Sequence, residues 1–85
     1  MKYSINYLAD ISYKIFSHQK HISYNNGLLK CDNGLGIEYK DNRMIIKGVE
    51  NYILHEFEFD NSNIAEEMAK MVSRVVLDEI MYDRY

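Results

Sequence analysis

Apolar residues near the start of the chain recur at intervals of three and four positions, which is the spacing of one helical face. From Ser4 to about Ser17 this face is formed by Ile5, Leu8, Ile11, Ile15 and Phe16. Ser4 is suited to be the N-cap, because a serine hydroxyl accepts a hydrogen bond from a free helical amide. The pattern predicts a helix over residues 4–17.

The middle of the chain changes to a period of two, which is typical of strands with one buried face. The last of these runs places Ile53, His55, Phe57 and Phe59 on its buried side. Three pairs of residues favour tight reversals, namely Asn26-Gly27, Asn33-Gly34 and Asp41-Asn42. We therefore expect an antiparallel meander with strands over residues 21–24, 28–32, 35–40, 43–47 and 51–59.

After Asp60 the period returns to that of a helix. Asn63 followed by Glu66 resembles a capping box, in which the two side chains satisfy each other's free backbone amides. The apolar face of this second helix comprises Ala65, Met68, Ala69, Val72, Val75, Val76 and Ile80. These residues should pack across the sheet.

A second apolar line on the same helix is formed by Met71, Leu77, Met81 and Tyr85. It makes the apolar face wider than one small sheet requires. Either the first helix covers this line, or the line is the interface of a homodimer.

Together these elements predict a single α+β domain over residues 1–85. It has an N-terminal helix, an antiparallel β-meander of three to five strands and a C-terminal helix packed on the sheet. Proline is absent, so no rigid linker divides the chain.

Composition supports a folded cytoplasmic protein. Hydrophobic residues make up 47% of the chain, far more than in a disordered segment. Cys31 is the only cysteine, which excludes an internal disulfide and suits a reducing compartment. We expect no membrane association, because the chain has no apolar run of membrane-spanning length and no signal-peptide pattern.

The net charge of −3 is unevenly distributed. Residues 1–48 carry seven basic and four acidic side chains (7 − 4 = +3), and residues 49–85 carry three basic and nine acidic ones (3 − 9 = −6). The candidate partner-binding residues are Glu56, Glu58, Asp60, Glu66 and Glu67. This surface would attract a protein partner with a basic surface, unless the charges serve only solubility.

The sequence offers no convincing catalytic, cofactor or metal site. His18 and His21 lie three residues apart, but zinc needs three or four ligands. Cys31 and His55 could both point to the inner face of the sheet, although a nucleophile also needs an orienting group and an oxyanion hole. We expect a non-enzymatic protein without cofactors, in which Cys31 is structural.

The order of helix, antiparallel strands and helix is similar to that of double-stranded-RNA-binding domains. In that family the second helix begins with a basic cluster on phosphates. The matching segment here is Ser62-Asn63-Ile64-Ala65-Glu66-Glu67-Met68-Ala69-Lys70. Glu66 and Glu67 stand where cations would be required, which argues against an RNA-binding domain of αβββα topology.

The element order and the acidic, motif-free composition also resemble small phage-encoded inhibitors of the anti-CRISPR type. The resemblance implies an inhibitor that blocks a host nucleic-acid-binding protein, with acidic side chains imitating phosphates. The alternative is a homodimeric structural or regulatory protein with no inhibitory role.

Overall fold

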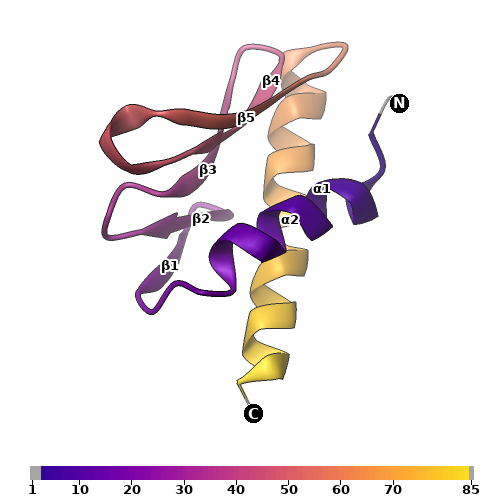
Figure 1. Cartoon of the computed structure of the whole chain (residues 1–85). Coiled ribbons are helices and arrows are strands. Elements are labelled where there is room, and N and C mark those ends of the chain that lie inside the picture. The colour runs from indigo at the N-terminus through magenta and orange to yellow at the C-terminus, as the bar shows by residue number, and fades with distance from the viewer. Residues whose placement is uncertain (1–2, 85) are drawn as a thin grey trace.

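The computed structural model describes residues 3–84 and contains two helices and a five-stranded sheet (Figure 1). The elements are α1 (Ile5–Phe16), β1 (Ile22–Asn25), β2 (Leu28–Cys31), β3 (Gly36–Lys40), β4 (Arg43–Lys47), η1 (Val49–Asn51), β5 (Ile53–Glu58) and α2 (Ser62–Asp83). The predicted fold class and order of elements are confirmed. Ser4 caps α1 as expected, since its side chain accepts a hydrogen bond from the Tyr7 amide.

The sheet is an antiparallel meander in which the strands lie in the order β1-β2-β3-β4-β5. Asn26 and Gly27 both adopt positive φ (53° and 82°) in the two-residue turn that pairs Asn25 with Leu28. Gly34 does so at 96° in the turn between β2 and β3, and Asp41 at 56° in the two-residue turn between β3 and β4. Polar and glycine residues tolerate this left-handed backbone, which explains why these turns could be located from the sequence.

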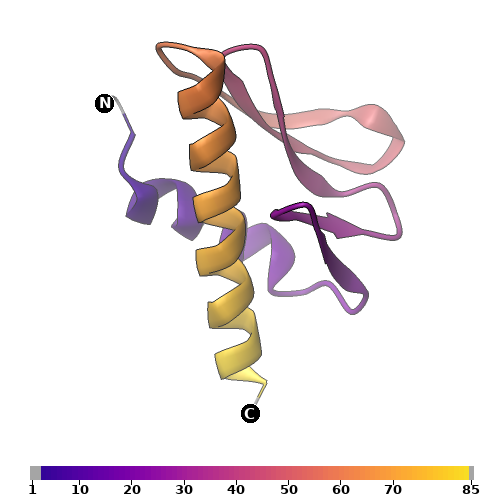
Figure 2. The same cartoon turned by 180° about the vertical axis from the view of Figure 1, so that it is seen from behind.

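Both helices lie on one face of the sheet. α2 packs across β2, β3 and β4, and α1 packs against α2. Figure 1 and the reverse view in Figure 2 show α1 crossing α2 while the sheet lies to one side of both. The core forms between this pair of helices and the inner face of the sheet.

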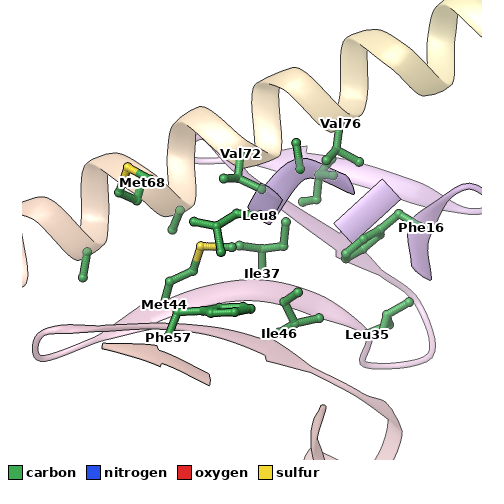
Figure 3. Close-up of a cluster of buried hydrophobic side chains, with 14 of the residues drawn as sticks. Leu8, Phe16, Leu35, Ile37, Met44, Ile46, Phe57, Met68, Val72 and Val76 are labelled. Atoms are coloured by element: carbon green, nitrogen blue, oxygen red, sulfur yellow. The ribbon is translucent and has the colours of Figure 1, made fainter. Parts of the chain in front are cut away.

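The core contains side chains from every layer (Figure 3). Leu8 and Phe16 of α1 meet Ile37 of β3, while α2 adds Val72 and Val76; all are at most 1% exposed. Each fully buried side chain of this size stabilises the fold by about 1.5–3 kcal/mol relative to an exposed one. The alternation in the strands and the helical periodicity of α2 thus converge on one core.

On the outer face of the sheet, Ile45 is covered by two ion pairs. This residue is only 8% exposed, although it points away from the core cluster. Its cross-strand neighbours are Glu38 and Glu56. Glu38 pairs with Lys47 at 3.3 Å and Glu56 pairs with Arg43, so the stems of two ion pairs cover the isoleucine.

The ladder between β2 and β3 is short: it consists of the residue pair Lys30 and Gly36, next to which the Cys31 amide donates to the Leu35 carbonyl at 2.7 Å. The Leu29 amide donates instead to the buried hydroxyl of Ser73 on α2, at 3.3 Å. A hollow of about 460 Å³ lies between β2 and β3, and Leu29 and Ile37 are among the residues that line it.

The start of α2 differs from the expectation. Asn61, not Asn63, is the N-cap, and its side chain accepts a hydrogen bond from the Ile64 amide at 2.9 Å. The predicted capping box is therefore wrong: Asn63 already lies inside the helix, and Glu66 pairs with Lys70 instead.

The last strand begins later than expected, at Ile53. Residues Val49–Asn51 form a short 3₁₀ turn in which Glu50 and Asn51 both adopt positive φ, at 56° and 66°. This left-handed backbone cannot continue a strand. The prediction that Ile53 belongs to the buried side is wrong, because it lies opposite Lys47 and is exposed. His55 lies on the inner face opposite Ile46, as expected, but it is exposed, whereas Phe57 and Phe59 are buried.

Candidate protein-interaction surface

Six of the nine acidic side chains in residues 49–85 lie in a stretch of the chain with no lysine or arginine. Residues 48–69 contain six carboxylates, namely Glu50, Glu56, Glu58, Asp60, Glu66 and Glu67. They lie on the β4–β5 loop, on the edge strand β5, just after it, and on the first turns of α2 (Figure 1). The negative charge of the sequence therefore has a defined place on the fold.

Two of the candidate carboxylates are paired with cations from other parts of the chain. Glu56 accepts a hydrogen bond from the Arg43 guanidinium on β4. Glu66 pairs with Lys70 at 2.7 Å, one turn along α2, and this carboxylate raises the pKa of the Lys70 ammonium. Glu56 and Glu66 are therefore partly neutralised before any partner binds.

Three of the five candidate carboxylates form no ion pair within residues 3–84. These are Glu58, Asp60 and Glu67, and all three are exposed. Glu58 lies opposite Arg43 in the β4–β5 register, but the arginine turns to Glu56. The candidate residues do not all share one face: Glu56 and Glu58 lie on the outer face of β5, whereas Glu66 lies on α2, which packs on the inner face.

The β4–β5 loop and the start of β5 expose apolar side chains that the sequence analysis did not single out. Val49, Tyr52, Ile53 and Leu54 are between 47% and 68% exposed. Val49 and Tyr52 lie in the loop before β5, and a register shift affects Ile53 and Leu54: Ile46 pairs with His55, but Lys47 pairs with Ile53, so β5 holds an extra residue. The four apolar residues within positions 49–54 were a signal in the sequence, but the alternating pattern assigned one of them, Ile53, to the core.

The same loop has a constrained backbone. The Gly48 amide donates to the Tyr52 carbonyl at 2.6 Å, and the Tyr52 amide donates to the Val49 carbonyl at 3.2 Å. A glutamate in the left-handed region, as at Glu50, costs about 1 kcal/mol or more and persists only where the surroundings fix it. The exposed apolar residues are thus held on a loop of defined shape.

The second apolar line of α2 is not one continuous surface. Met71 and Met81 are about half exposed, whereas Leu77 packs against the core cluster. Tyr85 lies outside the described residues. Within the described residues, the second apolar line therefore consists of two surface residues, Met71 and Met81, and of Leu77 at the rim of the core.

The structure separates the residues considered for catalysis. Cys31 is on β2 and His55 is on β5, so β3 and β4 lie between them. Neighbouring strands are about 4.8 Å apart, which places the two backbones about 14 Å from each other. Burial, and then the nearby Asp32 charge, raise the pKa of the Cys31 thiol and thus disfavour the reactive thiolate.

His18 and His21 are both exposed. Within the described part of the chain, no three side chains of histidine, cysteine, aspartate or glutamate are grouped to hold a metal ion. Neither helix, as far as residues 3–84 extend, combines the length and the apolar character required to cross a membrane. Comparison with family models, with curated proteins and with solved structures found no match for the chain.

Proposed function

We propose that this chain is a non-enzymatic protein-binding module that presents an acidic surface to a basic partner. The observation that carries the proposal is the stretch of residues 48–69, which follows a sheet edge and has six carboxylates without a lysine or arginine. Glu58, Asp60 and Glu67 are the residues expected to contact the partner. Such a surface steers association by long-range attraction.

The specific form that we propose is an inhibitor of a nucleic-acid-binding protein, as in phage-encoded proteins of the anti-CRISPR type. A protein that binds nucleic acid presents lysine and arginine side chains to phosphates. A row of carboxylates occupies such a surface and blocks it. Support comes from the placement of Glu56 and Glu58 in alternate positions of one strand, where their side chains share the outer face.

The test uses a charge reversal at two exposed positions, Glu58→Lys with Asp60→Lys. The matched control, Asp10→Lys with Asp32→Lys, changes the net charge equally at exposed sites on α1 and in the β2–β3 turn. The parent and both variants are used to capture proteins from cells that naturally contain the chain. Quantitative mass spectrometry then compares the captured proteins.

We expect the first variant to lose basic, nucleic-acid-binding proteins by about tenfold or more, and the control to retain them. The same proteins should be released as salt rises, because screening shortens the range of the attraction. Capture that depends on neither the reversal nor the salt concentration contradicts the proposal.

A homodimer through α2 is the second candidate function, favoured by the exposure of Met71 and Met81. These residues lie ten positions apart on one helix, and methionine is common at protein interfaces. Because Leu77 packs against the core, the available apolar area on α2 is smaller than the sequence suggested.

A further inference from the structure

We propose that the free edge of β5 binds an extended segment of the partner, with alternating basic and apolar residues, as an added sixth strand. The inference rests on the proposed function, since it names how the acidic surface would hold a basic protein. It adds a binding mode that the charges alone do not require.

The backbone of β5 has hydrogen-bonding groups that face away from the sheet. The Phe59 amide donates to the Asn42 carbonyl at 2.7 Å, and the register continues with Phe57 opposite Met44 and His55 opposite Ile46. In an antiparallel pair, alternate residues direct both backbone groups to the same neighbour. The amides and carbonyls of Glu56 and Glu58 therefore face the open side.

The two edges of the sheet differ. β1 is four residues long and β5 has six; neither strand includes lysine or proline, the residues that most often protect an edge. Regular pairing is available from His55 onward, because the register shift lies at Ile53 and Leu54. β5 is therefore the edge that accepts another strand more readily.

The side chains of β5 select the chemistry of that strand. Glu56 and Glu58 lie on the outer face, so residues opposite them should be lysine or arginine. His55 and Phe57 lie on the inner face, where their rings stack 5.9 Å apart, so residues opposite them should be apolar. A second copy of β5 is a poor occupant, because its glutamates would lie near these glutamates.

The probe is a short synthetic peptide of alternating lysine and valine residues, added to the full chain. NMR hydrogen exchange then follows the Glu56 and Glu58 amides. We expect these amides to exchange about tenfold more slowly or slower still at saturating peptide, with the β1 amides unchanged. A control peptide of the same sequence carries N-methyl groups on the amides that would face β5, and it should not protect them.

A matched pair of variants tests the same backbone contact by changing the protein instead of the peptide. Glu58→Gln removes the charge, and Glu58→Pro removes the charge together with the outward-facing amide. The proline variant should bind the peptide at least about fivefold more weakly than the glutamine variant. If the proline variant does not fold, the N-methylated peptide provides the same comparison on the parent chain.

Equal binding of the N-methylated peptide would overturn strand addition and leave charge attraction, and hence the proposed function, in place. Absence of any protection at Glu56 and Glu58 would also overturn it. The proposed function fails separately, when capture of basic proteins is indifferent to reversal of Glu58 and Asp60.

Discussion

Tyr13 of α1 forms a hydrogen bond to α2. Its hydroxyl donates to the Asp83 carboxylate near the end of that helix. This bond, followed by burial and by the charges of Asp83 and Glu79, raises the pKa of the Tyr13 phenol. The neutral phenol is therefore favoured by folding. Its contribution to stability is present below the ordinary tyrosine pKa of about 10 and is lost as the pH rises through the higher folded-state value.

Replacing Tyr13 with phenylalanine should lower the thermal midpoint slightly at pH 7, because only the bond to Asp83 is removed. It should also reduce the loss of stability above about pH 10, since the titrating group is gone. Thermal unfolding of both proteins as a function of pH measures this. Parallel curves above pH 10 would mean that Tyr13 does not contribute to the alkaline transition.

At the scale of elements, α2 is longer than the sheet can cover. Its 22 residues give a length of about 33 Å, and its last turns extend beyond the strands (Figures 1 and 2). Leu77 is still held against the core, while Met81 is exposed. The sequence placed both on one apolar line, because helical period cannot tell where the layer beneath a helix ends.

A charged side chain should affect the stability of the fold differently at Leu77 and at Met81. Leu77→Glu should destabilise the fold by about 2–4 kcal/mol, because it buries a carboxylate and removes apolar contacts. Met81→Lys should change the free energy of unfolding by no more than about 0.5 kcal/mol. Chemical denaturation measures both changes, and light scattering tests the dimer. A Met81→Lys variant that converts a dimeric parent into a monomer would support the interface on α2.

For the whole molecule, the change of period from helix to strand and back was enough to predict the order of elements. The turn residues were sufficient to place the reversals. The sequence could not predict the cap of α2, since Asn61 and Asn63 are equally able to accept a helical amide. It could not show that Arg43 neutralises Glu56 either, because that pairing depends on the register of two strands.

The exposure of Ile53 was missed for a related reason. Alternation assumes regular pairing, and one extra residue in β5 changes which positions face the core. The acidic segment itself was visible in the sequence. Which of its members have counterions became clear only from the fold.

The narrow junction between β2 and β3 divides the sheet into parts that need not unfold together. The β1–β2 hairpin also packs on α2, where the Ser73 hydroxyl accepts a hydrogen bond from the Leu29 amide. Ser73→Ala leaves that buried amide without this partner, at a cost of about 1–3 kcal/mol. Native-state hydrogen exchange should then show faster opening of β1 and β2, with β3, β4 and β5 little changed.

Uniform acceleration across all five strands would instead mean that the sheet opens as one unit. If the hairpin opens alone, the small domain has two levels of cooperativity. The three strands that include the acidic edge would stay folded while the far hairpin detaches. A binding surface on β5 would then be insulated from fluctuations at the opposite side of the sheet.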